Sequence, residues 1–274
     1  MDVRSNMRRV PDLSPRAEGR AVTAAGAEDA CWHLAEETPV AILLNGRNFA
    51  VMMMTPADLE DFAAGFAVTE GIVERASEID GLRIGEAADG LLVNLLIDPA
   101  RAARVEDRRR TFAGRTGCGV CGAQTIQAAL PKPRKVSGAL PDLAALEAAF
   151  EALAPAQLMN RANRTTHAAA FCDLSGAIQF VREDIGRHNA LDKLAGALVR
   201  AGRDAAAGFV LLSSRVSVEM VQKAAAIGAP ALAAVSAPSA LALRTARSAG
   251  MALFARSDAG VMHFPADAYG RGER

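Results

Sequence analysis

The residues best suited to chemistry are two cysteines in a glycine-rich loop, Gly117-Cys118-Gly119-Val120-Cys121-Gly122. Thiols separated by two residues can reach each other or one metal ion, and the glycines leave the backbone free to move. A short helix expected over Ala123–Leu130 would direct its positive end towards Cys121, and Arg115 lies just upstream. Both features favour a thiolate. Cys118 and Cys121 therefore suit a sulfur carrier, whose thiolate attacks a persulfide and keeps the outer sulfur.

Two other interpretations of the cysteine pair stay open. Zinc usually takes four protein ligands in a structural site, and only Cys31, Cys172 and four histidines remain, without a second close pair. A thioredoxin-like redox pair would end a strand and open a helix, whereas this pair lies in an Arg- and Gly-rich loop. Cys172 falls in an apolar strand and is expected to be a small buried hydrophobe. Cys31 is expected to have no chemical role.

A second polar segment, Arg182-Glu183-Asp184-Ile185-Gly186-Arg187-His188-Asn189, lies between a predicted strand and a predicted helix. Loops at such positions often carry functional side chains. Asn189 can also cap the helix, with Asp192 three residues later as a capping-box variant. Capping explains those two residues, but it does not explain Glu183, Asp184, Arg187 and His188 together, so these four remain candidates for a functional site.

A third segment, Ser213-Ser214-Arg215-Val216-Ser217, directly follows a predicted strand. Ligands of open α/β sheets bind beyond the carboxyl ends of strands, and hydroxyls, an arginine and a helix N-terminus suit a phosphate. On this motif alone we favour an ordinary turn capped by Ser217. A lone histidine such as His167 is likewise more often structural than a ligand.

Composition excludes some classes of protein. The 274 residues carry a formal net charge of zero, which argues against a dedicated nucleic-acid binder. Residues 1–28 lack an apolar run after their basic residues, so they are not a secretory signal. No window approaches the length of a membrane span. We expect a cytoplasmic protein whose residues 1–28 are a disordered tail.

Hydrophobic periodicity predicts the elements that position these segments. In the first half we expect a hairpin across Asn45-Gly46, a helix with Thr55 as its N-cap that Gly71 closes, and a buried strand over Leu91–Ile97. Residues 101–122 hold six arginines and four glycines, so no helix is expected there and 101–116 is predicted to be a flexible basic gate. In the second half we expect strands over 168–174, 177–182, 209–212, 231–235, 251–255 and 261–264, and helices over 143–153, 189–201, 218–227 and 239–249.

This alternation of strands and helices predicts an α/β fold, a layered mixed sheet with helices on both faces. The strands that start at Phe209 and Met251 should be parallel, because each reaches its neighbour through a helix. We divide the chain into the tail 1–28, an N-terminal part 29–135 with the hairpin, the helix and the mobile cysteine loop, and an α/β core 136–274 with the cofactor-binding loops.

These motifs together resemble one family, the formate dehydrogenase accessory sulfurtransferases, from about Thr38 to Phe264. The segments that carry the resemblance are Met54-Thr55-Pro56, Gly65-Phe66-Ala67-Val68-Thr69-Glu70-Gly71, Thr116 to Gly122, Glu183-Asp184-Ile185-Gly186-Arg187-His188-Asn189-Ala190-Leu191-Asp192-Lys193, and Arg215-Val216-Ser217 with Glu219 and Lys223. The most specific of these is the segment that begins at Glu183.

The resemblance implies a sulfurtransferase, a persulfide carrier required for formate dehydrogenase activity. Family members accept sulfur from a cysteine desulfurase and pass it to the molybdenum of a bis-guanine-dinucleotide molybdopterin cofactor. Cys118 would carry the persulfide and Cys121 would assist. The family's fold resembles that of cytidine deaminases. This chain lacks a His-x-Glu with Pro-Cys-x-x-Cys, so deaminase zinc chemistry is not implied and no metal site is expected.

The resemblance also implies partners and a cofactor site. The partners are the desulfurase, the formate dehydrogenase catalytic subunit and a second copy in a homodimer. The cofactor, with GDP as its fragment, would contact Phe254, Ala255, Arg256, Ser257, Asp258, Ala259, Arg215, His188, Arg187 and His167. The chain departs from the family where Asn163-Arg164-Thr165-Thr166 precedes His167, where Ser213-Ser214-Arg215 replaces Ser-Gly-Arg, and after Arg256.

The rival hypothesis is a non-catalytic cofactor chaperone. Such a protein would bind the nucleotide cofactor and hand it over, with a CxxC pair that is structural or holds zinc. A covalently bound outer sulfur on Cys118 distinguishes the two hypotheses.

Overall fold

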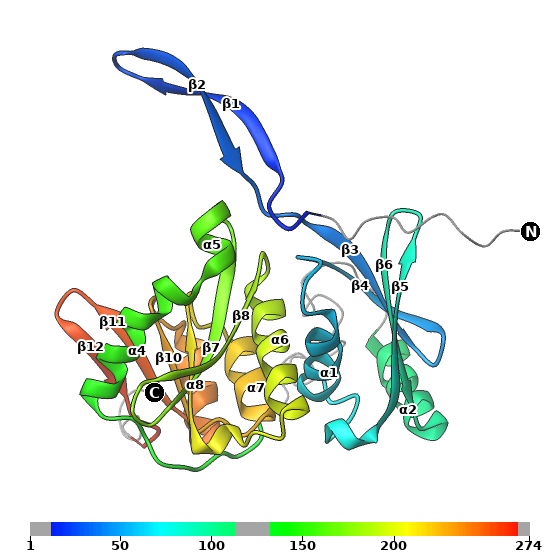
Figure 1. The fold of residues 1–274 in the computed structure, drawn as a ribbon. Coiled ribbons are helices and arrows are strands. Elements are labelled where there is room, and N and C mark those ends of the chain that lie inside the picture. The colour runs from blue at the N-terminus through cyan, green and yellow to red at the C-terminus, as the bar shows by residue number, and fades with distance from the viewer. Residues whose placement is uncertain (1–11, 113–131, 268–274) are drawn as a thin grey trace, which may run out of the picture.

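The structure is a computed structural model that describes residues 12–112 and 132–267, with side chains for all of these except 107–112 (Figure 1). In this part of the chain the strands form three sheets, of two, six and four strands. The strands are β1 (Arg16–Thr23), β2 (Gly26–His33), β3 (Thr38–Leu44), β4 (Arg47–Met54), β5 (Ile79–Ala87), β6 (Gly90–Ile97), β7 (His167–Asp173), β8 (Ile178–Asp184), β9 (Gly208–Leu212), β10 (Ala231–Ala234), β11 (Ala252–Ser257) and β12 (Gly260–Phe264). The helices are α1 (Leu59–Thr69), α2 (Pro99–Phe112), α4 (Leu143–Ala156), α5 (Leu158–Asn163), α6 (Arg187–Arg200), α7 (Val218–Ala226) and α8 (Ala240–Ala249), with 3₁₀ turns η1 (Ala76–Glu78) and η2 (Ala205–Ala207).

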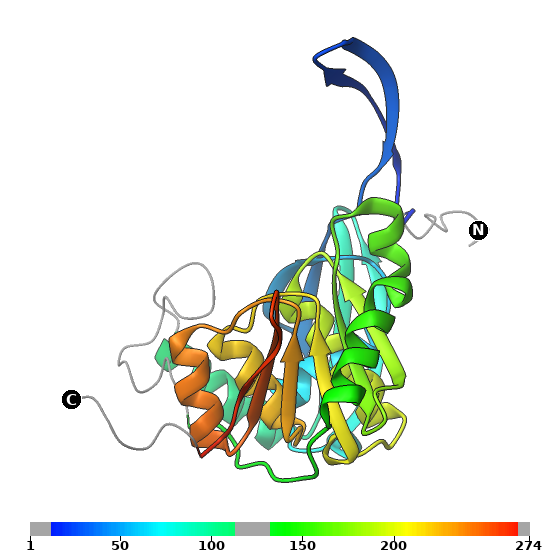
Figure 2. The ribbon, with the colours of Figure 1, turned by 90° about the vertical axis from the view of Figure 1, so that its left-hand side faces the viewer.

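The six-stranded sheet, in the order β12-β11-β10-β9-β7-β8, forms the centre of the second half. Strands β9, β10 and β11 are parallel, and the other pairs are antiparallel. Helix α4 packs on one face of this sheet, and α6, α7 and α8 pack on the other (Figure 2). The predicted mixed sheet with helices on both faces, and its parallel strands, are therefore confirmed. The likeness to cytidine deaminases stays a prediction.

The four-stranded sheet, in the order β4-β3-β6-β5, belongs to the first half. Burial alternates strictly along β3, because its residues on one face pack against α1 and α2 while the other face is open. Asn45 and Gly46 both have positive φ angles, 49° and 81°, which confirms the type I′ hairpin between β3 and β4. The boundary expected near residue 135 falls between the two larger sheets and stays a prediction.

Helices α1 and α6 join the two halves through two glycines. A Cβ on Gly65 would lie 1.8 Å from the carbonyl oxygen of Asp192, and one on Gly196 would lie 1.7 Å from that of Asp61. Only glycine permits this approach, so the two helix backbones are in direct contact. The first half of the chain is thereby held against the layer of helices that covers the six-stranded sheet (Figure 1).

The prediction of a disordered tail over residues 1–28 is wrong for residues 16–28. They form β1, the turn after it and the first three residues of β2. The two strands pair in register from Arg16–His33 to Thr23–Gly26 and project from the body as a ribbon (Figure 1). Neither strand contributes to the main core, so both consist largely of small and charged residues. The hydrophobic pattern that predicts strands is therefore weak here. Residues 1–11 lie outside the described part.

The prediction that residues 101–122 contain no helix is wrong for residues 101–112, which continue α2. Asp98 accepts a hydrogen bond from the N–H of Arg101 (2.8 Å) and so caps the helix. Ala102 and Val105 are buried against the four-stranded sheet. Arginine and alanine both favour helices, so a high charge does not exclude one. None of the helices in the described ranges is long and apolar enough to cross a membrane.

Candidate functional site

Several predicted site residues meet at one edge of the six-stranded sheet, where β9, β10 and β11 end. Strand β7 runs antiparallel to β9 and pairs Ala169 with Leu212, so His167 lies at the edge where β9 ends. Strand β8 pairs Asp184 with His167 and ends there too. The loops after β8, β9 and β11 therefore share this carboxyl edge, as expected of ligand-binding loops in open α/β sheets.

Arg187 and His188 occupy the first turn of α6, whose N-cap is Gly186. The Nε atom of Arg187 and the Nε2 atom of His188 are buried and have no hydrogen-bond partner among the described residues. Glu219, in the first turn of α7, places its Oε2 4.0 Å from His188 Nε2. Buried polar groups are nearly always paired, so two unpaired nitrogens beside a helix N-terminus suit the binding of a polar or anionic ligand.

The electrostatics of this cluster keep both histidines neutral near pH 7. Burial, followed by the charge of Arg187, lowers the pKa of His167. Burial also lowers the pKa of His188, as do Arg187 and Lys223, while Glu219 and Glu70 oppose the change. Burial raises the pKa of Glu219, but hydrogen bonds and the nearby His188 and Arg187 outweigh it, so the net change is downward. The cluster therefore combines one permanent cation, one carboxylate and two neutral imidazoles.

Glu183 has a structural role rather than a catalytic one. Its carboxylate accepts hydrogen bonds from the N–H groups of Met159 and Asn160, both at 2.8 Å, at the start of α5. The hydroxyl of Thr166 donates a third, at 3.0 Å. Glu183 thus fixes the segment between α5 and His167 against β8.

Asp184 also acts inside the fold. Both its side chain and that of Lys193 are fully buried, and they form an ion pair of 2.7 Å. Thr55 donates to Asp184 from its N–H and its hydroxyl, at 3.1 and 2.9 Å. Asn189 donates to Asp184 and to the carbonyl of Met53. The predicted caps at Thr55 and Asn189 are therefore wrong, because α1 begins at Leu59, α6 begins at Arg187, and both polar side chains serve Asp184 instead.

Asp192 also makes its contacts inside the fold. It contacts Lys223 of α7 at 2.9 Å and accepts a hydrogen bond from the hydroxyl of Thr69 at 2.6 Å. Lys223 also pairs with Glu70 at 2.6 Å. The prediction that Asp192 belongs to a capping box is wrong. Asp192 lies in α6 beyond its first turn, and its contacts join α6 to α1 and α7. Most of the segment from Glu183 to Lys193 thus positions Arg187 and His188.

Of the residues predicted from Phe254 onwards, Phe254 and Arg256 lie on the other face of the sheet. Phe254 is buried on the α4 side, where its ring stacks on His263 with centroids 4.5 Å apart. The Arg256 guanidinium lies 6.0 Å from the ring centroid of Phe150 in α4. Ala255 is buried, whereas Ser257, Asp258, Ala259 and Arg215 are exposed. The structure therefore gathers Arg187, His188 and His167 together and separates them from Phe254 and Arg256 by the sheet.

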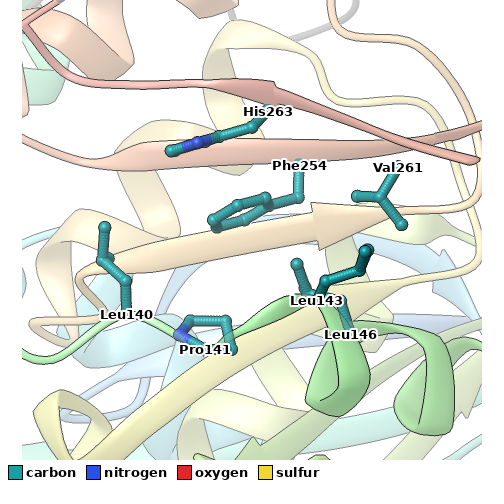
Figure 3. Close-up of a pocket in the computed structure, with 7 residues that line it drawn as sticks. All are labelled: Leu140, Pro141, Leu143, Leu146, Phe254, Val261 and His263. Carbon is teal, nitrogen blue, oxygen red and sulfur yellow. The ribbon is translucent and has the colours of Figure 1, made fainter.

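A shallow hollow of about 270 Å³ lies beside Phe254 (Figure 3). Its walls are apolar apart from His263, and Figure 3 shows the rings of Phe254 and His263 one above the other. Phe254 was predicted only from the resemblance, and no pattern in the sequence predicted His263. His263 lies beside Phe254 because β12 pairs with β11. The lining residues are Leu140, Pro141, Leu143, Leu146, Phe254, Val261 and His263.

The cysteines divide into two groups. Cys118 and Cys121 lie outside the described residues, as does the predicted helix 123–130. Cys172 is buried in β7, where burial and then Asp173 raise the pKa of its thiol to about 12, so its predicted inert character is supported. Cys31 is exposed in β2. Within the described part of the chain, no group of three or more His, Cys, Asp or Glu side chains is arranged to hold a metal ion.

Comparisons with known proteins show which family the chain resembles. The family model described as the FdhD/NarQ family matches residues 35–264. A protein of Bordetella petrii named "Sulfur carrier protein FdhD" is 48% identical over 254 residues, which cover 91% of this chain and 90% of the relative. One of the same name from Cupriavidus necator is 49% identical over 233 residues, 84% of this chain and 81% of the relative.

A solved structure also matches this fold. The crystal structure of a protein from Desulfotalea psychrophila, assigned as a formate dehydrogenase accessory protein, superposes with a TM-score of 0.73. It is 27% identical, and the match covers 94% of this chain and 99% of that one. Because the family model spans both larger sheets and the relatives align over most of their length, the chain belongs to the FdhD/NarQ family.

Proposed function

We propose that this protein is a cytoplasmic sulfur carrier, a sulfurtransferase that serves a formate dehydrogenase. It takes sulfur from a cysteine desulfurase as a persulfide on Cys118 and transfers it to the molybdenum of the bis-guanine-dinucleotide molybdopterin cofactor. The observation that carries the proposal is the Gly-flanked pair Cys118 and Cys121 inside a chain that matches the family from residue 35 to 264. The names of the relatives, which call them sulfur carriers, support it.

The loading step is a simple exchange. The Cys118 thiolate attacks the outer sulfur of the desulfurase persulfide, and a new S–S bond forms. The S–S bond within the donor breaks, its electron pair remains on the donor cysteine, and that thiolate takes up a proton. Neither sulfur needs an external oxidant or reductant. Arg115 favours this step because its positive charge stabilises a thiolate. Glycines 117, 119 and 122 favour it because residues without side chains leave the thiolate accessible.

The cofactor, as cargo, is proposed to bind at the carboxyl edge of the six-stranded sheet. The unpaired Nε of Arg187 and the N-terminus of α6 suit a phosphate oxygen, and neutral His188 and His167 can donate hydrogen bonds beside them. Arg215 adds a cation after β9. Phe254 and Arg256 offer a second contact surface on the opposite face. GDP, as a fragment of the cofactor, would report which surface is used.

Intact mass spectrometry tests the carrier role. The full chain is incubated with a desulfurase and cysteine, and we expect it to gain one sulfur atom that a reductant removes. Cys118→Ala should abolish the gain, and Cys121→Ala should retain it but slow transfer. Cys172→Ala and Cys31→Ala are the matched controls, since one thiol is buried with a pKa of about 12 and the other is exposed on the projecting ribbon.

The competing function, a non-catalytic cofactor chaperone, predicts a different result. Such a protein would bind GDP and the cofactor but would gain no sulfur at Cys118. If Cys118→Ala loads as well as the parent, the persulfide assignment is wrong. Loading at Cys31 alone would show that the assay reports exposure rather than function.

A further inference from the structure

Two long segments of the chain contain no acidic residue. Residues 108–141 hold seven Lys or Arg and no Asp or Glu, and residues 220–257 hold four Lys or Arg and no Asp or Glu. The whole chain has 31 acidic and 31 basic residues, so an even distribution would place about four acidic residues in each segment. The first of the two segments contains Cys118 and Cys121.

The fold brings these two segments together at the C-terminal ends of α7 and α8. The N–H of Val136 donates a hydrogen bond to the carbonyl of Ala249, the last residue of α8, at 2.8 Å. The guanidinium of Arg134 donates to the carbonyl of Ala226, the last residue of α7, at 3.3 Å. The stretch 132–136 therefore runs across the ends of both helices.

Exposed cations gather around this contact. Arg244 and Arg247 are three residues apart in α8, so they share the side of the helix that faces away from the buried Ala242 and Ala246. No described element covers this outer side of α8 (Figure 2). We define the α8 basic surface by its five exposed cations, Lys132, Arg134, Lys135, Arg244 and Arg247.

The fold does not neutralise these charges. Among the described residues, no carboxylate forms an ion pair with any of the five cations. Arg134 and Arg247 have a local role as well, because cations stabilise the C-terminal ends of helices. Asp204 borders the surface, since Ala206 contacts Gly138, but its carboxylate caps η2. Helix capping does not explain Lys132, Lys135 and Arg244.

The α8 basic surface lies at the opposite end of the six-stranded sheet from Arg187 and His188. Ala226 and Ala249 come shortly before β10 and β11 begin, so the surface is at the amino edge of these parallel strands. The ten residues of α8, about 15 Å long, separate this edge from the carboxyl edge. A protein bound to the α8 basic surface therefore leaves the carboxyl edge free for the cofactor.

We propose that the α8 basic surface docks the protein that donates the sulfur, through an acidic surface beside the persulfide of that protein, a role that rests on the sulfur-carrier function proposed above. Lys132 is the first described residue after Cys121, so the chain keeps that cysteine within about 40 Å of it. A donor held here is within reach of the cysteines. A protein that receives the cofactor must instead reach the carboxyl edge.

The rate of sulfur loading tests the docking surface. The full chain is mixed with limiting amounts of a desulfurase and cysteine, and intact mass spectrometry follows the added sulfur at low and at high salt. Lys135→Glu with Arg244→Glu should slow loading at least about tenfold at low salt, because the donor would no longer be steered to the surface. The difference should shrink as salt screens the charges.

Matched variants separate docking from other effects of charge. Arg161→Glu with Arg164→Glu makes the same change in net charge at the end of α5, towards the other edge of the sheet, and should leave the rate unchanged. Lys135→Gln with Arg244→Gln removes the charges without reversing them and should slow loading by a smaller factor. Urea unfolding checks that every variant is folded. Cysteine persulfide, a small donor that needs no docking, should load all of them at the rate of the parent.

The outcomes distinguish the docking surface from the function on which it rests. Equal loading by the desulfurase in the parent and in Lys135→Glu with Arg244→Glu at low salt overturns the docking surface. Equal slowing in the control pair also overturns it, because total charge would then attract the donor. Slower loading from cysteine persulfide overturns it as well, because the cations would then act on the thiols. A parent that gains sulfur from neither source refutes the sulfur-carrier function, and the docking surface with it.

Discussion

Asp184 and Lys193 form an ion pair of 2.7 Å in which both side chains are fully buried. The pair joins the end of β8 to the second turn of α6, directly beneath Arg187 and His188. Thr55, Gly186 and Asn189 supply further hydrogen bonds to the carboxylate. A buried charge is tolerated only when it is paired and hydrogen-bonded, so this network sets the backbone that presents the candidate site.

Lys193→Met should destabilise the protein by about 3–5 kcal/mol, because it leaves the Asp184 carboxylate buried without a cation. The double variant Asp184→Asn with Lys193→Met should lose less than the two single variants added together. Urea unfolding of the four proteins gives the coupling free energy directly. Arg20→Ala, which removes an exposed ion pair on the ribbon, should cost under about 1 kcal/mol. Additive losses at Asp184 and Lys193 would contradict the buried pair.

Gly196→Ala should destabilise the contact between α1 and α6 by about 3 kcal/mol or more, since the new Cβ would overlap the carbonyl of Asp61. The helices would have to separate, and the hydrogen bonds at Asp192 should weaken with them. The control is Gly85→Ala on β5, where nothing lies within 4 Å of the added atom. Equal unfolding free energies for the two variants would show that the helices do not meet as closely as described.

The lowered pKa of His188 predicts a loss of stability in acid. The unfolded chain binds a proton to this histidine near pH 6.5, whereas the folded chain resists it, so the free energy of unfolding falls as the pH drops below about 6.5. His188→Gln should make that decline shallower, and His33→Gln on the exposed ribbon should not. Urea unfolding at several pH values between about 5 and 8 measures the slope. An unchanged slope in His188→Gln would refute the assignment.

GDP should bind at low salt and more weakly as ionic strength rises, because the contacts are with cations. Arg215→Ala and Arg256→Ala are both expected to weaken binding, and Arg187→Ala distinguishes the two faces of the sheet. If Arg187→Ala is the more severe, the phosphates lie on the α6 side, and if Arg256→Ala is, they lie on the α4 side. Arg203→Ala, beyond the opposite end of α6, is the control. Calorimetry that detects no GDP binding at low salt would reject this site.

The sequence predicted the elements of the second half well, because apolar runs and turn residues are local signals. Strands β7 to β12 and helices α4, α7 and α8 lie within a few residues of their expected positions. The ribbon of β1 and β2 and the charged helix α2 were not predicted, because apolar residues do not recur in them at a regular spacing. The parallel run of β9, β10 and β11 also followed from the chain alone, because a helix separates each pair.

The sequence alone therefore determined the family, the cysteine pair and the edge of the sheet at which the polar loops meet. Only the tertiary structure decided what the segment from Glu183 to Lys193 does, since its partners Thr55, Thr69 and Lys223 lie on other elements. The sequence alone does not distinguish the five other polar residues of this segment from Arg187 and His188. They differ in burial and in hydrogen bonding, which depend on contacts between residues far apart in the chain and leave no local pattern.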